Sequence, residues 1–148
     1  MRLNVISRGS GPPIVFLHGL GASATTWNAV AETLSDRHLT MAVDLLGHGG
    51  SACPDDPEEF SRDAALADLD DVLSTLDERA LLVGHSLGGY MALAHAATRP
   101  GATTGIVVLN TGPGFRDPEK REASNERSRG DAHRFGVPEP GADPTPPH

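Results

Sequence analysis

The sequence has one cysteine, no long apolar run and little positive charge, and each shortage excludes a class of protein. Cys53 alone forms no internal disulfide, and no paired cysteines stand at the spacing of a zinc site. No apolar run approaches the ~20 residues that span a bilayer. Residues 1–10 also lack the charged and apolar regions of a signal peptide. We therefore expect a cytoplasmic protein with no metal and no membrane contact.

The charge balance argues against nucleic acid as a partner. The net charge is −8, and no basic stripe or nucleic-acid motif occurs along the 148 residues. The length suits one compact domain. We expect a small-molecule substrate rather than a nucleic acid.

Short apolar runs alternate with helix-period stretches, which is typical of a parallel sheet whose crossovers are helices. The runs lack polar alternation, so we expect helices to cover both faces of these strands. An edge strand is also predicted at residues 3–7. The four main predicted strands are residues 14–17, 39–43, 80–83 and 106–109.

Three helices are predicted between these strands. The first has apolar residues at Trp27, Val30, Ala31 and Leu34, and the third covers residues 86–98 and ends before Pro100. In the second, Ser61 is expected to cap the N-terminus. The apolar face of the second helix comprises Leu66, Leu69, Val72, Leu73 and Leu76, and its expected solvated face carries Asp68, Asp70 and Asp71.

The apolar pattern ends after Asn110. Residues 113–148 contain seven prolines, and their large apolar residues are only Phe115, Phe135 and Val137. Such a segment cannot build a core, so we expect a disordered tail in which residues 119–129 form at most a polar helix. The predicted organisation is a folded portion at residues 1–112 and a tail at 113–148.

Residues 84–88 read Gly-His-Ser-Leu-Gly, the G-x-S-x-G pattern of a nucleophile on a strand-to-helix turn. The predicted strand before it and helix after it supply the context that this mechanism needs. We expect Ser86 to be the catalytic nucleophile, with Gly84, His85 and Gly88 supporting the turn. The alternative is that Ser86 only caps a helix.

A second motif, His18-Gly19-Leu20-Gly21, follows the first main strand. Backbone N–H groups of Leu20 and Leu87 are candidates for an oxyanion hole, in which each donor is worth roughly 3–4 kcal/mol in the transition state. We expect His18 and Gly19 to support the motif, with the His18 ring shaping the loop by hydrogen bonding rather than acting as the base.

With a third motif at residues 44–51, Asp-Leu-Leu-Gly-His-Gly-Gly-Ser, the chain from residue 3 to 111 resembles the α/β-hydrolase family of serine esterases, lactonases and haloperoxidases. Leu46 and Gly50 stand where this family often has arginine. The resemblance implies an α/β fold with an incomplete doubly wound, mostly parallel sheet. It also implies hydrolysis of a small ester, lactone or amide through an acyl-enzyme at Ser86 without a cofactor. A serine at this position argues against the branches that use aspartate, such as epoxide hydrolases.

One rival interpretation is a dinucleotide site. Gly19, Gly21 and Ala24 fit a G-x-G-x-x-A fingerprint after a strand, and Asp44 at the end of the next strand would bind the ribose. This hypothesis, a nicotinamide-dependent oxidoreductase, leaves the turn around Ser86 unexplained.

The acid and base of a catalytic triad are not assigned. In this fold both follow the serine in the sequence, yet no apolar strand follows Leu109. We therefore expect a truncated, weakly active or inactive chain, or a non-catalytic binding module, whose strand at 106–109 is an exposed edge that favours self-association. The residues that we weighed as substitutes and set aside are His48, His85, His95, His133, His148 and Asp117.

Overall fold

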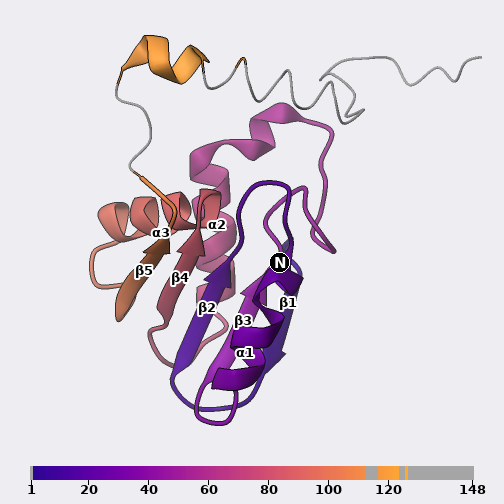
Figure 1. Cartoon of the computed structure of the whole chain (residues 1–148), viewed down its shortest axis with the longest axis vertical. Coiled ribbons are helices and arrows are strands. Elements are labelled where there is room, and N and C mark those ends of the chain that lie inside the picture. Colours follow the sequence, from indigo (N-terminus) through magenta and orange to yellow (C-terminus); the bar gives the residue numbers. More distant parts are fainter. Residues whose placement is uncertain (1, 113–116, 124–125, 127–148) are drawn as a thin grey trace, which may run out of the picture. The chain divides into compact units, whose positions relative to one another are not determined.

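The computed structural model describes residues 2–112, 117–123 and 126, and the chain divides into two units, Met1–Pro113 and Gly114–His148. The first unit has a five-stranded sheet in the order β1-β3-β2-β4-β5 (Figure 1). β1 is antiparallel to β3, and the other neighbours are parallel, which confirms the predicted α/β fold with its mostly parallel sheet. The strands are β1 (Val5–Arg8), β2 (Pro13–Leu17), β3 (Leu39–Val43), β4 (Leu81–His85) and β5 (Gly105–Leu109).

Helices cover the two faces of the sheet unequally. One face is packed by α1 (Asn28–Leu34), which continues from the 3-10 turn η1 (Ala24–Trp27). The opposite face is packed by α2 (Arg62–Leu73), preceded by the 3-10 turn η2 (Pro57–Phe60), and by α3 (Leu87–Thr98) (Figure 1). The chain is therefore doubly wound.

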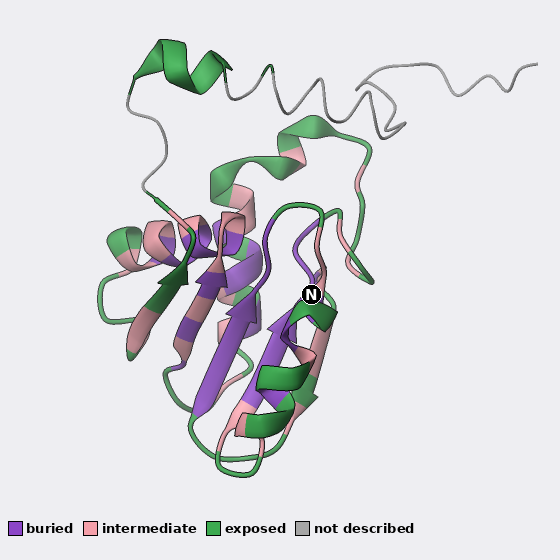
Figure 2. Cartoon of the chain, viewed as in Figure 1, coloured by how far each residue is buried: buried purple, intermediate pink, exposed green. Residues whose placement is uncertain are grey.

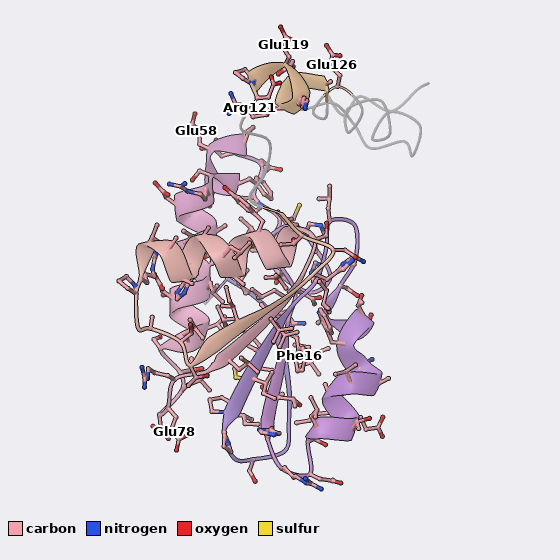
Figure 3. The ribbon with its side chains drawn as sticks, turned by 60° about the vertical axis from the view of Figure 1, so that its left-hand side comes forward. Phe16, Glu58, Glu78, Glu119, Arg121 and Glu126 are labelled. Carbon is pink, nitrogen blue, oxygen red and sulfur yellow. The ribbon has the colours of Figure 1, made fainter. Side chains whose placement is uncertain are left out.

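The core lies in two layers because alternate residues of β2 point to opposite faces. Phe16 faces α1, where its ring lies 5.1 Å from that of Trp27 (Figure 3). Val15 and Leu17 pack into the larger cluster with α2 and α3. All five residues of β2 are buried, as predicted for a strand covered on both faces (Figure 2).

The expectation that both faces of β5 are covered is wrong. Val107, Val108 and Leu109 are 43%, 39% and 44% exposed. In the part of the chain that the structure describes, β5 pairs with β4 alone, so it is an edge strand. α3 contacts β5, whereas the face that α1 covers further along the sheet is open here (Figure 2).

Two helical expectations need correction. The apolar spacing of the first predicted helix puts Val30 on its buried face, but Val30 is 45% exposed. The 3-10 turn η1 ends at Trp27 and the α-helix α1 begins at Asn28, so the apolar spacing does not run through both. In α1 the buried residue is Ala31, and Val30 lies about 100° around the helix axis from it. The second correction concerns the acidic residues of α2, because Asp68 is buried in an ion pair with Arg2 rather than solvated. Ser61 caps α2 as predicted, its hydroxyl accepting the Ala64 N–H at 3.3 Å.

The observed bounds of β1 and β4 differ by one or two residues from those predicted from the sequence. β1 starts at Val5 rather than residue 3, and Leu3 is a buried core residue ahead of it. β4 runs on through Gly84 and His85, two residues beyond the predicted end. The first two residues of the G-x-S-x-G motif therefore belong to the strand itself.

In the second unit, residues 118–123 and 126 are helical. The Asp117 carboxylate accepts the Glu119 N–H at 2.9 Å at the start of this segment. The other predictions for the tail, including those for His133 and His148, fall outside the described residues. Within the residues that the structure describes, no helix is long and apolar enough to cross a membrane.

Candidate active site

Ser86 occupies the turn between β4 and α3 with an unusual backbone conformation. Its φ is 50° and its ψ is −112°, a region that costs a non-glycine residue of order 1–3 kcal/mol. The neighbouring strand holds this turn, because the Ser86 N–H donates to the Leu109 carbonyl at 2.9 Å. The Ser86 carbonyl in turn accepts hydrogen bonds from the Tyr90 N–H, at 3.0 Å, and from the Thr111 hydroxyl.

Two glycines of the motif lie where backbone segments touch. A Cβ on Gly84 would lie 2.4 Å from the Gly88 carbonyl oxygen, and one on Gly88 would lie 2.3 Å from the Leu17 carbonyl oxygen. Neither neighbour is a flexible side chain that can move aside. The G-x-S-x-G spacing therefore follows from the close approach of β2, β4 and α3 at this turn.

The loop after β2 packs directly against Ser86. The Gly88 N–H donates to the His18 carbonyl at 3.1 Å, and a Cβ on Gly19 would lie 3.3 Å from Cβ of Ser86. Within residues 2–112, neither the Leu20 N–H nor the Leu87 N–H donates a hydrogen bond. Two unengaged amide donors thus flank the serine, one from the loop and one from the first residue of α3.

The His18 ring is fully buried and joins two loops. Its Nδ1 lies 2.7 Å from the Gly19 carbonyl, and its Nε2 lies 3.0 Å from the Leu45 N–H. Nδ1 therefore carries the proton and Nε2 accepts. Burial lowers the pKa of His18, which keeps this neutral form at neutral pH. With both nitrogens engaged, the ring has no lone pair to offer Ser86.

Asp44, at the end of β3, ties the third motif to the loop after β2. Its carboxylate accepts the Ala24 N–H at 2.6 Å, the Gly50 N–H at 2.9 Å and the Asn4 side-chain amide at 2.8 Å. Burial of Asp44 opposes ionisation, but these hydrogen bonds outweigh it, so its pKa lies below the usual value. Both carboxylate oxygens thus accept hydrogen bonds from the protein itself, which gives Asp44 a structural role that needs no bound ribose.

His48 also holds the loop after β2, through a hydrogen bond to Gly21. Its Nε2 accepts the Gly21 N–H at 3.1 Å, and its Nδ1 lies 3.0 Å from the Leu46 carbonyl. Its ring centroid lies 5.1 Å from that of His18. The loop that carries the Leu20 amide is therefore held by hydrogen bonds from both histidines and from Asp44.

The other described histidines make no hydrogen bond to Ser86 either. His95 is buried in α3 with Nε2 2.9 Å from the Asp70 carboxylate, which also accepts from Arg99 at 2.6 Å. The Asp70 side chain remains 41% exposed in this pairing, so its place on the solvated face of α2 holds. His85 lies half-buried at the end of β4, with its ring against Gly19. His38 contacts the carbonyl of Pro12, the residue before β2, at the N-terminal end of that strand.

Metal ligands are not clustered in the described parts of the chain. No group of three or more histidine, cysteine, aspartate or glutamate side chains there is arranged to hold a metal ion. Cys53 is exposed and unpaired.

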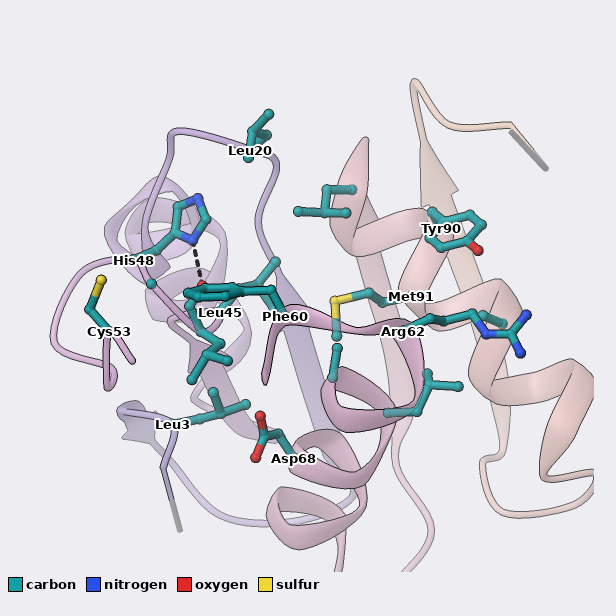
Figure 4. A pocket seen from close by; sticks show the side chains of 16 residues that line it. Leu3, Leu20, Leu45, His48, Cys53, Phe60, Arg62, Asp68, Tyr90 and Met91 are labelled. Atoms are coloured by element: carbon teal, nitrogen blue, oxygen red, sulfur yellow. Dashed lines mark hydrogen bonds between the residues drawn. The ribbon is translucent and has the colours of Figure 1, made fainter. Parts of the chain in front are cut away.

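A pocket of about 490 Å³ lies beside this turn (Figure 4). Its walls come from the loop after β3, from η2 and from the facing sides of α2 and α3. Leu20 and Leu87, whose amides flank Ser86, both line it. The lining also includes Leu3, Leu45, Leu46, His48, Cys53, Phe60, Arg62, Ala65, Leu66, Asp68, Tyr90, Met91 and Ala94.

Comparison with known proteins gives the family. The model of the Alpha/beta hydrolase family matches residues 14–147, which is most of the chain. The chain belongs to the alpha/beta hydrolase family. This confirms the resemblance drawn from the three motifs, which all lie within the matched range.

Individual hydrolases show the same likeness. The 2-(acetamidomethylene)succinate hydrolase of Mesorhizobium japonicum is 37% identical over 112 residues, 75% of this chain and 40% of that protein. Epoxide hydrolase 3 of Xenopus tropicalis is 31% identical over 113 residues, 74% of this chain and 31% of that protein. A solved esterase from a marine microorganism superposes with a TM-score of 0.76 at 27% identity, covering 97% of this chain and 52% of that one. The chain thus spans about a third to a half of the length of these relatives.

Sequence analysis of this alpha/beta hydrolase missed Thr111. The apolar pattern that predicts the strand ends before residues 110 and 111 and gives them no role. The structure instead places the Thr111 hydroxyl on the Ser86 carbonyl and gives Asn110 a φ of 49°. An asparagine followed by threonine at the end of a strand was the available signal, because asparagine tolerates positive φ.

Proposed function

We propose that this alpha/beta hydrolase is a serine hydrolase that acts on a small ester, lactone or amide through an acyl-enzyme at Ser86. The observation that carries the proposal is the position of Ser86 on a positive-φ turn between two unengaged amides, those of Leu20 and Leu87. A serine that served only as a helix cap would accept a hydrogen bond from the helix through its side chain. The Ser86 side chain makes no such bond to α3.

In this mechanism, Oγ of Ser86 attacks the substrate carbonyl carbon as its hydroxyl proton passes to solvent water. The carbonyl oxygen becomes an oxyanion that the Leu20 and Leu87 N–H groups stabilise. Collapse of the tetrahedral intermediate releases an alcohol or amine, which takes up a proton and leaves an acyl ester on Ser86. Water then attacks this ester, releases the acid and restores the serine. The positive end of α3 favours the negative charge at both steps.

The proposal assigns no residue as the general base for Ser86 and none as the acid that would orient that base. His18 and His48 use both ring nitrogens in loop contacts, and His95 is paired with Asp70. A serine hydrolase deprived of its base retains the contribution of substrate binding and the oxyanion hole. We therefore propose that acylation of Ser86 is slow with the groups that the described residues supply.

The nature of the relatives bears on the substrate class. One is named as a hydrolase of an acetamido compound and another is a solved esterase, which supports amides and esters as candidates. The epoxide hydrolase among them shows that the fold also carries other chemistry. Serine rather than aspartate at position 86 favours acyl transfer in this chain.

Trapping the acyl-enzyme tests the proposal. Incubation with 4-nitrophenyl acetate, followed by acid quench and peptide mass spectrometry, should show an acetyl group on the peptide that contains Ser86. The Ser86→Ala variant should lack that adduct while showing the same circular dichroism spectrum. Acetylation spread over surface lysines alone, with none at Ser86, would refute the nucleophile assignment.

A second candidate function is a non-catalytic binding module. It is favoured by the absence of any hydrogen bond between Ser86 and a described histidine. This candidate predicts that an ester analogue binds and is never cleaved. Acyl-enzyme on the Ser86 peptide would exclude it.

A further inference from the structure

The pocket of about 490 Å³ opens beside the two amides that flank Ser86 (Figure 4). Its volume lies within the range of roughly 300–1,000 Å³ that small-molecule sites occupy. In Figure 4, Leu20 lies at the top of the view, with Leu45, Phe60 and Met91 below it. Leu87 also lines the pocket. A carbonyl group held by the Leu20 and Leu87 amides would therefore have this pocket on one side of it.

The imidazole and the carboxylate of the lining, those of His48 and Asp68, are already engaged by the protein. His48 uses both ring nitrogens, for Gly21 and Leu46. The Asp68 carboxylate is buried in its two contacts with Arg2, at 2.9 and 3.0 Å. A ligand group that entered would find no unpaired imidazole or carboxylate among these.

Arg62, the one cationic side chain in the lining, belongs to the rim. Its side chain is 57% exposed and contacts the Asp63 carboxylate at 3.3 Å. In Figure 4 its guanidinium points away from Leu45 and Phe60. The remaining lining is formed mainly by leucine, methionine, alanine and phenylalanine side chains. The interior therefore suits an uncharged apolar group.

We infer that this pocket binds an uncharged aliphatic acyl chain whose carbonyl lies at Ser86. The inference rests on the proposed function, because it takes the Leu20 and Leu87 amides to hold the reacting carbonyl. It narrows the substrate class to acyl derivatives with an aliphatic chain. Part of the substrate specificity then resides in η2, α2 and α3 of this chain.

A chain-length series of primary amides tests the inference without turnover. Butanamide, hexanamide and octanamide carry the same uncharged head group, and calorimetric titration gives a dissociation constant for each. Burying one methylene is worth about 0.8 kcal/mol, so affinity should rise up to about fourfold per added methylene. Equal affinities across the series would overturn the inference.

Two matched variants locate the binding site on α3. Ala94 lines the pocket, whereas Ala97, three residues further on, is exposed and outside it. Ala94→Phe should fill the pocket and lower octanamide affinity by at least tenfold, while Ala97→Phe should leave it unchanged. Equal loss in both variants, or loss in neither, would place the chain elsewhere and refute the assignment. Circular dichroism checks that each variant is folded.

The outcomes separate this inference from the proposed function. Chain-length-dependent binding without acylation of Ser86 would retain the pocket and reject the nucleophile. Acylation of Ser86 without any chain-length dependence would do the reverse.

Discussion

The hydroxyl of Thr111 donates a hydrogen bond to the carbonyl oxygen of Ser86. Two residues earlier, the Leu109 carbonyl accepts the Ser86 N–H at 2.9 Å. Asn110, between them, has a φ of 49°, which turns the chain back toward α3. The end of β5 therefore binds both the N–H and the carbonyl of Ser86, whose own φ is 50°. Such external contacts are what a strained turn needs to persist.

Removing the Thr111 hydroxyl should loosen this turn. Thr111→Val keeps the shape of the side chain but leaves the Ser86 carbonyl one donor short, which costs about 0.5–1.5 kcal/mol of unfolding free energy. We expect the rate of Ser86 acylation to fall severalfold, measured by mass spectrometry. Thr111→Ser should restore that rate. If both variants acylate at the wild-type rate, the contact does not position the serine.

Gly88 should tolerate no larger residue. In Gly88→Ala, the new methyl group would lie 2.3 Å from the Leu17 carbonyl oxygen, so β2 and α3 must separate. Overpacking of this kind costs about 1–3 kcal/mol, and urea unfolding should show it. The control is Gly112→Ala, because a Cβ at Gly112 meets nothing within 4 Å. Indistinguishable unfolding midpoints for the two variants would contradict the packing described for the turn.

Asp44 should stabilise the fold in a pH-dependent way. Its pKa is depressed below the usual value near 3.8, so its contribution is complete above that pH and is lost as pH falls through the lower folded-state pKa. Asp44→Asn should therefore be less stable than the wild type at pH 6. The difference should shrink on acidification below about pH 4. Urea unfolding at several pH values measures it, and a constant difference throughout would show that the carboxylate charge is not responsible.

The edge strand β5 should promote self-association. Val107, Val108 and Leu109 are partly exposed on it, and the sequence has no charged residue between Arg99 and Arg116 to discourage pairing. We expect larger species at high protein concentration in sedimentation velocity experiments. Val108→Lys places a charge on the edge and should shift the population toward monomer. A wild-type chain that stays monomeric at every concentration would contradict this expectation.

The sequence predicted best what depends on neighbours along the chain. The strand at residues 39–43 was predicted with its observed bounds, and the turn at Ser86 lies between a strand and a helix as its glycine spacing requires. These features follow from apolar runs and from steric limits that local residues impose.

Contacts between distant segments were not predictable in the same way. Asp68 looked solvated on its helix because its partner, Arg2, is 66 residues away. The pairing of Asp70 with His95 and the contact of Thr111 with Ser86 each join separate elements. The pocket beside Leu87 likewise combines side chains from several segments. No periodic pattern in one segment carries that information.

Site-specific labelling tests the central claim, that Ser86 is a preformed nucleophile, most directly. The folded chain is treated with a fluorophosphonate probe, and the adduct is located by peptide mass spectrometry, with Ser86→Ala and urea-unfolded protein as controls. We predict slow labelling confined to Ser86, absent from both controls. Labelling that is absent from the folded protein, or that is equal at other serines, would contradict the claim and leave the turn without catalytic function.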